Sequence, residues 1–320
     1  MPRVFHGNFE FEHELAEGSR FQLSRKLQRI NALWAGRLTS LMSSGDALFV
    51  PGWNLLNEIE QTTLLEWCGE LQLLSQPRML ADEFEDFIPW GWTEGMVLRA
   101  ESLGLSCSPP SLDAVRWLNA RGTSFELEQT FEVAPPGCRR IGSIAELEEH
   151  LTSFDAEAAW VIKAEFGMSG RERILGRGTN LQLIDQGWLQ RRLTGSGRVY
   201  FEPWFDRLEE MSFHYEIAPD GVVRFLGATR LQCDDCGRYQ SNQHVDFEGS
   251  PDLKSEWAVS RTTTEACAKR AAERSYFGPL SIDSMRYRTS DRTIRERPLQ
   301  DINGRWTMGR CELERALRER

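Results

Sequence analysis

The chain has 320 residues, of which 40% are hydrophobic, and it carries a formal net charge of −10 at pH 7. This composition excludes a disordered chain, and the length leaves room for two or three domains with cores of their own. The negative charge argues against nucleic acid as the main partner, and no apolar run approaches the ~18 residues that identify a membrane span.

The start of the chain, from Met1 to His6, lacks the apolar core of a signal peptide. The seven cysteines, an odd number in a chain of this length, indicate reduced thiols and not a disulfide framework. We therefore expect a cytoplasmic protein that has no membrane among its partners.

The N-terminal third alternates between strand and helix patterns. A strand and turn are expected near residues 5–13, a second strand at residues 47–51, and helices at residues 23–41 and 54–74. These elements predict an α/β domain over residues 1–108.

Some polar and aromatic residues of this segment allow two interpretations. Asn8 and His13 are candidates for substrate contact, although a polar turn and a histidine on a helix surface are the commoner alternatives. The tryptophans either line a pocket or fill a core, and large aromatic residues do the second more often. These tryptophans are Trp53, Trp90 and Trp92.

The next segment contains elements that lead toward a phosphate-binding pattern. We expect a helix near residues 115–121, a proline-containing strand at residues 133–135, and a helix that begins after Ser143. Ser143 is the expected N-cap of that helix, and Glu146 completes a capping box.

An apolar strand over residues 160–164 delivers Lys163 to a loop that contains Gly167, Ser169 and Gly170. Glycines let backbone amides approach a phosphate, and a lysine adds a compact positive charge. Lysine is scarce beside arginine in this chain, so its position at the end of an apolar strand is informative. A lysine that merely extends toward solvent is the alternative.

A strand over residues 198–204 runs into a bend, with Glu202 just before Pro203. Residues 209–217 then alternate strictly, turn at residues 220–221 and return through residues 222–230, which predicts a β-hairpin. We expect most of the polar face of the first strand to be solvated, and we assign only Glu210 to a site. This face carries Glu210, Ser212, His214 and Glu216.

Cys233 and Cys236 have the spacing of half a zinc site. No second Cys-x-x-Cys or His-x-x-x-His motif follows, so a loop with incidental thiols is the better interpretation.

A second hairpin is predicted from residues 278–287 and 293–302, with residues 289–292 as its turn. Asp301 and Asn303 present two oxygen ligands on one side of the strand, while Ile302 faces the core. With the turn centred near Asp291, Asp283 lies about two or three residues out of register with Asp301, still within reach of a shared metal ion. This pattern predicts a magnesium site, and two exposed carboxylates at a strand end are the alternative.

The order of these elements resembles the ATP-grasp superfamily over roughly residues 105–310. The resemblance implies a mixed fold (α+β / α/β) in which two α+β subdomains, residues 109–200 and 201–320, sandwich a nucleotide behind the N-terminal α/β domain. The ending from Asn303 to Arg310 is similar to a bacterial subgroup of uncharacterised ligase-like sequences in this family.

The same resemblance implies roles for individual residues. Lys163 and its loop, Gly167, Ser169 and Gly170, would hold the phosphates of ATP. Glu202 and Trp204 would meet the adenine or ribose edge, and Glu210 would bind ribose or orient Lys163. The expected ligands of Mg²⁺, with Mn²⁺ as an alternative ion, are Asp283, Asp301 and Asn303.

Arg305 would bind a substrate carboxylate or the acyl phosphate, and Arg230 and Arg286 would add positive charge near the transferred phosphoryl group. Two departures from the family pattern stand out. The family usually has Glu where Asp301 stands, and it commonly supplies a second lysine on the preceding strand, where only Arg139 and Arg140 are found.

The resemblance implies an ATP- and Mg²⁺-dependent ligase that joins a small-molecule carboxylate to an amine through an acyl phosphate. A loop from Gly167 to Gly178 would shield that intermediate from water. A phosphotransferase or kinase, and a nucleotide-binding protein that has lost turnover, are the alternatives. A homodimer is the default expectation for the oligomeric state.

Overall fold

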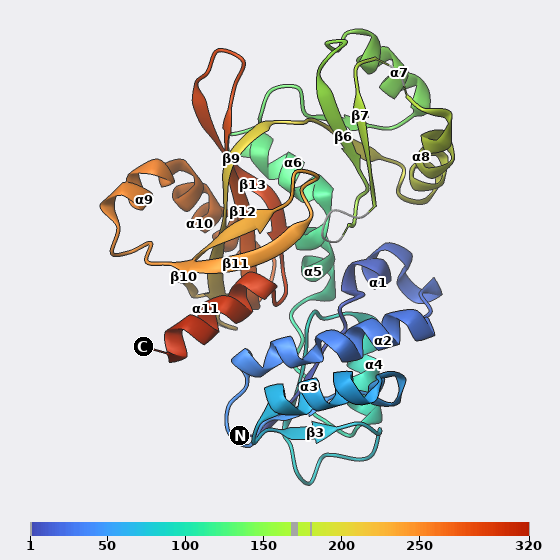
Figure 1. The fold of residues 1–320 in the computed structure, drawn as a ribbon, viewed down its shortest axis with the longest axis vertical. Coiled ribbons are helices and arrows are strands. Elements are labelled where there is room, and N and C mark those ends of the chain that lie inside the picture. The colour runs from blue at the N-terminus through green and yellow to red at the C-terminus, as the bar shows by residue number, and fades with distance from the viewer. Residues whose placement is uncertain (1, 168–171, 180, 320) are drawn as a thin grey trace.

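The computed structural model describes residues 2–167, 172–179 and 181–319, and these residues build three sheets with helices around them. Figure 1 shows an N-terminal unit at the bottom, a small unit with α7 and α8 at the upper right, and a large sheet with α9, α10 and α11 at the left. Helices α5 (Leu112–Asn119) and α6 (Arg121–Thr130) lie in the middle, between the units.

The N-terminal unit is built on a parallel sheet with the strand order β3-β2-β1-β4. Its strands are β1 (Arg3–His6), β2 (Ala47–Phe49), β3 (Gln72–Leu74) and β4 (Asp86–Pro89). Its helices are α1 (Phe11–Glu17), α2 (Arg25–Trp34), α3 (Glu58–Cys68) and α4 (Glu94–Ser102), with 3-10 helices η1 (Gly18–Arg20), η2 (Ala35–Leu41) and η3 (Trp53–Leu55). The α/β character expected of this segment is confirmed.

Two helices of this unit are shorter than the sequence pattern predicted. The helix expected over residues 54–74 ends at Cys68, because Gly69 has a φ of 54° and lets the chain turn toward β3. The helix expected over residues 23–41 changes from α to 3-10 geometry at Ala35. Gly36 explains the close approach of this second part to α3, since a Cβ there would lie 2.5 Å from Trp67.

The small unit is an antiparallel sheet with the strand order β5-β8-β6-β7. Its elements are β5 (Arg139–Ile141), α7 (Ile144–Thr152), β6 (Ala159–Lys163), β7 (Arg173–Arg177), α8 (Leu183–Ser196) and β8 (Val199–Pro203). Trp160 and Ile162 of β6 pack in one core with residues of α7 and α8. Because side chains alternate along a strand, Lys163 lies on the opposite face.

The strand expected at residues 133–135 was wrong: the chain between α6 and β5 is irregular. Pro135 and Pro136 have no N–H to contribute to a ladder, and pairing begins only at Arg139. The N-cap at Ser143 is confirmed, since its side chain accepts a hydrogen bond from Glu146 N. The carboxylate of Glu146 accepts from Gly142 N and not from the N-cap residue itself.

The large unit is an antiparallel sheet with the strand order β11-β10-β9-β12-β13. Its strands are β9 (Asp206–Ile217), β10 (Val223–Cys233), β11 (Tyr239–Val245), β12 (Gly278–Arg288) and β13 (Ile294–Asn303). Its helices are α9 (Pro251–Glu256), α10 (Ala258–Glu273) and α11 (Met308–Arg318). Both predicted hairpins, β9–β10 and β12–β13, are confirmed.

The polar face of β9 is not solvated, and this expectation was wrong. Glu210, Ser212 and His214 are all buried, and Glu216 pairs with Arg310 of α11. The apolar face of the same strand packs against α10, so the sheet is covered on both faces. His214 lies between Ser281 and Thr229 at 2.9 Å from each, and burial lowers the pKa of its imidazole to about 3.

The register expected between Asp283 and Asp301 was also wrong, because the two residues lie directly opposite each other. The hairpin register shifts between Asp283 and Met285, where Ser284 alone stands across from residues 298–300. Pro298 marks this bulge, in which the strand carries extra residues without ladder bonds. The bulge removes the offset that a regular hairpin would have left between the two carboxylates.

The domain boundaries after residues 108 and 200 remain predictions. Strand β8 crosses the second of these boundaries and pairs with both β5 and β6. We propose that this boundary follows Pro203. In the described part of the chain, no helix combines the length and apolarity that crossing a bilayer requires.

Glu10, at the N-terminus of α1, is a buried carboxyl group with 2% of its surface exposed. Its Oε2 accepts a hydrogen bond from Asn31 Nδ2 at 2.5 Å. Burial, reinforced by the charges of Glu14 and Glu12, raises the pKa of Glu10 to about 7. The ordinary pKa of this group is about 4.5. Between pH 4.5 and about pH 7, the folded state therefore binds more protons than the unfolded state.

We therefore predict that Glu10→Gln stabilises the protein above pH 7 and not below about pH 4. The free energy of unfolding of the native chain falls as pH rises through this window, and the variant lacks that loss. Urea unfolding at about pH 8 should show a gain on the order of 3 kcal/mol. Glu17→Gln, an exposed change on the same helix, should show no gain, and a gain for Glu10→Gln that is equal at both pH values would contradict the prediction.

Candidate functional site

A cavity of about 690 Å³ lies between the N-terminal unit and one face of the large sheet. Phe9, Trp34 and Trp90 contribute the wall from the N-terminal unit. The sheet contributes Glu210, Ser212, Asp283, Gln300, Asp301 and Asn303. Arg305 comes from the bend after β13, and Gly167 reaches the cavity from the small unit. The structure thus brings all three predicted metal ligands to one cavity with Glu210 and Arg305.

Asp283 is the most perturbed carboxyl group of this cavity. Its Oδ1 accepts a hydrogen bond from the Ser212 hydroxyl, and its Oδ2 accepts one from Asn303 Nδ2 at 3.2 Å. Burial raises the pKa of Asp283 to about 7, and the neighbouring charges of Asp301 and Glu210 act in the same direction. The site therefore places a buried carboxyl group beside two further carboxylates, Asp301 and Glu210.

This donor set suits a divalent cation with oxygen ligands. Within the described residues, no group of three or more His, Cys, Asp and Glu side chains converges as a metal site. Two opposed carboxylates with an amide from Asn303 nevertheless fit Mg²⁺, which commonly takes one or two protein carboxylates and completes its shell with water and phosphate. Gln300 Oε1 is buried and has no hydrogen-bond partner among the described residues, so a further oxygen is available beside the carboxylates.

Lys163 and Glu202 form a buried ion pair with an Nζ–Oε2 distance of 2.6 Å. The same Glu202 oxygen accepts from Arg297 Nη1 at 2.7 Å, and Arg297 Nε donates to Glu128 at 2.7 Å. Burial alone would raise the pKa of Glu202, but Arg297, Lys163 and Arg121 outweigh it and hold that pKa well below its usual range. The Glu202 side chain is thus committed to protein contacts, and neither Glu202 nor Lys163 lines the cavity that holds Asp301.

Arg121 connects this ionic network to the carboxylate cluster, and sequence reasoning missed it. Its Nη2 lies 3.4 Å from Asp301 Oδ2, and its Nη1 donates to Gln300 O at 3.0 Å. Burial opposes its charge, but the fields of Asp301 and Glu202 raise the pKa of Arg121. The helical spacing of Arg121, Ser124 and Glu128, all buried, was the available signal for a charged face turned inward.

The predicted substitute for the missing lysine lies elsewhere. Arg139 is exposed, 3.8 Å from Glu146, and lines a different cavity with Arg140. The cation beside Lys163 and Asp301 therefore comes from the start of α6 and not from the strand that follows it.

The three arginines expected to act on substrate are not brought together. Arg305 lines the cavity, donates to Glu12 and to Trp306 O, and has a buried Nε without a partner in the described structure. Arg286 instead pairs with Glu209 and Glu256, and Arg230 lies 3.5 Å from Glu209. Neither of these two lines the cavity.

Trp204 lies at the hinge between the small and large units. The guanidinium carbons of Arg207 and Arg173 lie 4.6 Å and 5.9 Å from its ring centroid. Arg173 also donates to the carbonyl oxygen of Cys236. The loop that carries Cys233 and Cys236 thus contacts the hinge, and no third zinc ligand converges on it within the described residues.

The remaining predicted residues divide as follows. Gly167 lines the cavity, whereas Ser169 and Gly170 lie outside the described residues. Asn8 is buried and exchanges hydrogen bonds with the backbone of Gly91, a structural role.

Comparisons with known proteins supply the context for this site. No family model matches the chain, and no curated protein does so either. Among solved structures, it is similar to N5-carboxyaminoimidazole synthetase from Staphylococcus aureus complexed with ADP, with 9% identity and a TM-score of 0.53, over 96% of this chain and 71% of that one.

Two further structures extend the comparison. The biotin carboxylase domain dimer of 2-oxoglutarate carboxylase from Hydrogenobacter thermophilus, in complex with MgADP, ADP and bicarbonate, gives 12% identity and a TM-score of 0.57, over 99% of this chain and 70% of that one. Phosphoribosylamine–glycine ligase from Thermotoga maritima gives 13% identity and a TM-score of 0.54, over 97% of this chain and 70% of that one. At these identities the likeness shows the fold alone, and the chain spans about seven tenths of each of these proteins.

The ionic network generates a stability prediction. Arg297→Met should destabilise the protein by about 3–5 kcal/mol, because Glu128 and Glu202 would stay buried without their main cation. Urea unfolding should show this loss, and Arg288→Met, an exposed change on the same hairpin, should stay within about 1 kcal/mol of the native chain. Adding Glu128→Gln and Glu202→Gln to Arg297→Met should recover stability. A loss under about 1 kcal/mol for Arg297→Met alone would refute the network's role.

Proposed function

The chain has the ATP-grasp fold. We propose that it is an ATP- and Mg²⁺-dependent ligase that joins a carboxylate to an amine through an acyl phosphate. The observation that supports this most directly is the convergence of Asp283, Asp301 and Asn303 at one cavity. Arg121 ties that cluster to the ion pair of Lys163 and Glu202.

The nucleotide would lie between the small unit and the large sheet. Lys163 and Arg121 would supply positive charge to its phosphates, and Gly167 would let backbone amides approach them. Glu202 would position Lys163 through their ion pair, because its carboxylate is already engaged by Arg297. Trp204 at the hinge would meet the adenine.

Asp283, Asp301 and Asn303 would hold the metal ion. A bound Mg²⁺ neutralises phosphate charge and lowers the barrier for an anionic carboxylate to approach the γ-phosphate. The direct pairing of Asp283 with Asp301 across the two strands supports this assignment, because it places two carboxylates within reach of one cation.

The proposed reaction has two steps. A carboxylate oxygen of the acid attacks the γ-phosphorus, the bond to the bridging oxygen breaks, and ADP leaves with an acyl phosphate formed. The amine nitrogen then attacks the acyl carbon and loses a proton, and phosphate leaves. Arg305, in the cavity and beside the carboxylate cluster, would contact the acid or its phosphorylated form.

We predict that Asp301→Ala and Asn303→Ala each weaken Mg²⁺-dependent ATP binding at least tenfold, because each removes an oxygen ligand. Calorimetric titration with and without Mg²⁺ would measure this, with Asp252→Ala on exposed α9 as the control. Unchanged Mg-ATP affinity in both variants would refute the metal assignment. ATP binding without ADP release, or a phosphorylated product without free phosphate, would select an inactive binding protein or a phosphotransferase instead.

The cavity wall from the N-terminal unit suggests the kind of acid that would be used. Phe9 and Trp90 are nearly buried, with ring centroids 4.7 Å apart, and Trp34 meets Phe9 edge-on at 5.8 Å. Trp34 is 36% exposed, so part of its ring faces open space. We propose that the acid carries an apolar body that packs on this aromatic surface.

We predict that Trp34→Ala lowers kcat/KM for an aromatic acid such as phenylacetate at least tenfold and leaves acetate unchanged. Hydroxylamine as the amine would trap the acyl group as a hydroxamate, which a colour reaction measures. Leu33→Ala is the matched control, since Leu33 is exposed on the same helix and does not line the cavity. Equal losses for both acids would argue against the apolar contact.

A further inference from the structure

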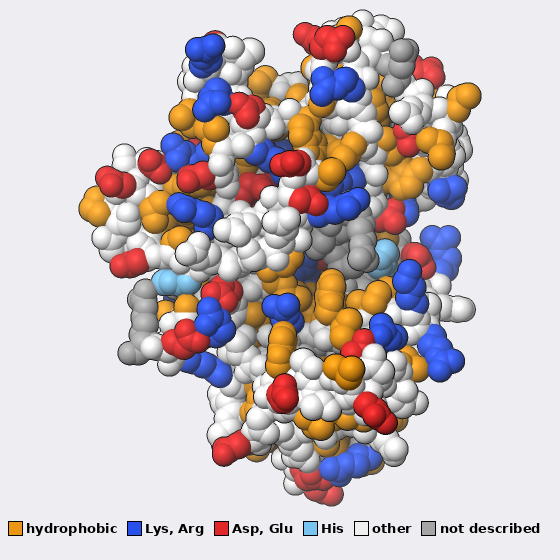
Figure 2. Space-filling model, in the orientation of Figure 1, with side chains coloured by type: hydrophobic (Ala, Val, Ile, Leu, Met, Phe, Trp, Pro, Cys, Tyr) orange, Lys and Arg blue, Asp and Glu red, His pale blue; other side chains and the backbone are white. Residues whose placement is uncertain are grey.

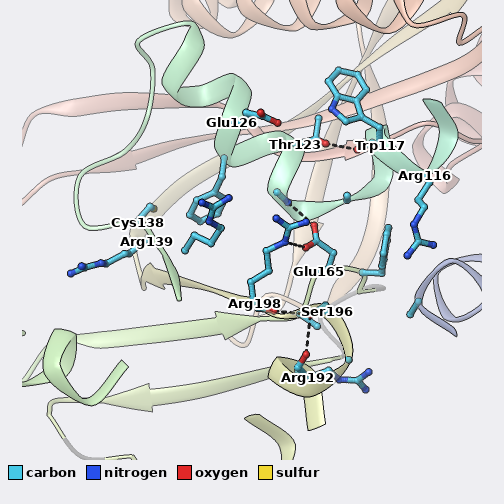
Figure 3. Close-up of a pocket in the computed structure, with 18 of the residues that line it drawn as sticks. Arg116, Trp117, Thr123, Glu126, Cys138, Arg139, Glu165, Arg192, Ser196 and Arg198 are labelled. Carbon is cyan, nitrogen blue, oxygen red and sulfur yellow. Dashed lines mark hydrogen bonds and ion pairs between the residues drawn. The ribbon is translucent and has the colours of Figure 1, made fainter. Parts of the chain in front are cut away.

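A second cavity, of about 1010 Å³, lies between α1, helices α5 and α6, and the small unit. It shares no lining residue with the cavity that holds Asp301. Figure 3 shows its side chains, with Arg116 on one side, Arg139 on the opposite side, and Arg192 and Arg198 between them. It is therefore a separate feature of the fold.

The lining of this cavity is strongly basic although the chain as a whole has a net charge of −10. Its arginines outnumber its carboxylates seven to three, a surplus of four positive charges. The arginines are Arg20, Arg116, Arg139, Arg140, Arg191, Arg192 and Arg198, and the carboxylates are Asp113, Glu126 and Glu165. On the face shown in Figure 2, Lys and Arg side chains gather along the right-hand edge, near α1 and α8.

The three lining carboxylates are either already hydrogen-bonded or exposed to solvent. Glu165 is the buried one, and its two oxygens already accept hydrogen bonds from Gly122 N, Arg198 Nε and the Tyr200 hydroxyl. Asp113 and Glu126 are exposed, so solvent screens them.

Several arginines remain without an acidic partner among the described residues. Arg20, Arg140 and Arg191 make no ion pair there. Arg116 donates only to Leu15 O and packs over Phe166, with its guanidinium carbon 4.8 Å from the ring centroid. Arg20 and Arg116 lie on the N-terminal side of the cavity, and Arg140 and Arg191 on the side of the small unit.

We infer that this cavity binds a small molecule that carries two or more anionic groups, phosphates or carboxylates, which bridge the two basic walls. Guanidinium groups bind both kinds of anion through paired hydrogen bonds, and the volume is that of a small-molecule site. Single anions such as orthophosphate engage one wall and bind weakly. The inference does not depend on the ligase reaction, because no residue of the metal cluster takes part.

The test is calorimetric titration of the full chain, without Mg²⁺, with tripolyphosphate, citrate and orthophosphate. We expect tripolyphosphate or citrate to bind saturably and at least tenfold more tightly than orthophosphate. The probe with the higher affinity shows whether the site prefers phosphates or carboxylates. Arg20→Glu on one wall and Arg140→Glu on the other should each weaken that probe at least tenfold. Both residues are exposed, so the variants should fold as the native chain does.

Two controls separate this site from other sources of anion binding. The first control is the double variant Arg292→Glu and Arg295→Glu. Both residues are exposed near the tip of the β12–β13 hairpin, so the variant changes the net charge without altering the cavity and should leave binding unchanged. Lys163→Met identifies binding at the proposed nucleotide site, because that site would lose a cation while the second cavity would not. No saturable binding of either probe, equal binding of orthophosphate, equal losses in the hairpin control, or a loss confined to Lys163→Met would overturn the inference.

Discussion

A buried ionic network holds the small unit, α6 and the large sheet in one arrangement. Arg297 of β13 is fully buried and binds Glu128 of α6 and Glu202 of β8, and Glu202 also binds Lys163 of β6. A charge buried this deeply without a partner would cost several kcal/mol, so each member requires the others. Since the members come from four elements, the network is complete only when these elements are docked. That docking fixes the position of Lys163.

Charge is distributed unevenly over this acidic protein, and the unevenness separates two kinds of site. The carboxylates of β9, β12 and β13 meet at one cavity, where burial, reinforced by the charge of Asp301, raises the pKa of Asp283. The arginines of η1, α5, β5 and α8, with Arg198 just before β8, meet at another, where the one buried carboxylate is already hydrogen-bonded. The first place gathers negative side chains and the second gathers positive ones, and α6 lies between them with Arg121 at its start.

Much of the architecture followed from periodicity and turn chemistry. The alternation of β9, the turn at residues 220–221 and the apolar strand ending at Lys163 all predicted elements that the fold contains. The mixed fold, an ATP-grasp fold, was expected from the resemblance to that superfamily and not from periodicity. The expected solvated face of β9 failed because alternation shows that a strand has two faces and cannot show what covers the second, here α11 and the cavity wall. Arg121 was missed because a cation on a helix and a carboxylate on a strand, here Asp301, meet only when the chain is folded.

Most of the local elements could be predicted from the sequence, and so could the side of the strand on which Asp301 and Asn303 lie, because backbone geometry over two residues sets that side. The direct opposition of Asp283 and Asp301 could not, because it depends on a bulge at Pro298 that no periodicity encodes. Only the tertiary structure paired Arg121 with Asp301 and Arg297 with Glu202, residues 180 and 95 positions apart in the chain. Such pairings depend on how whole units dock, and docking is governed by burial and charge balance summed over many residues and not by any short stretch of them.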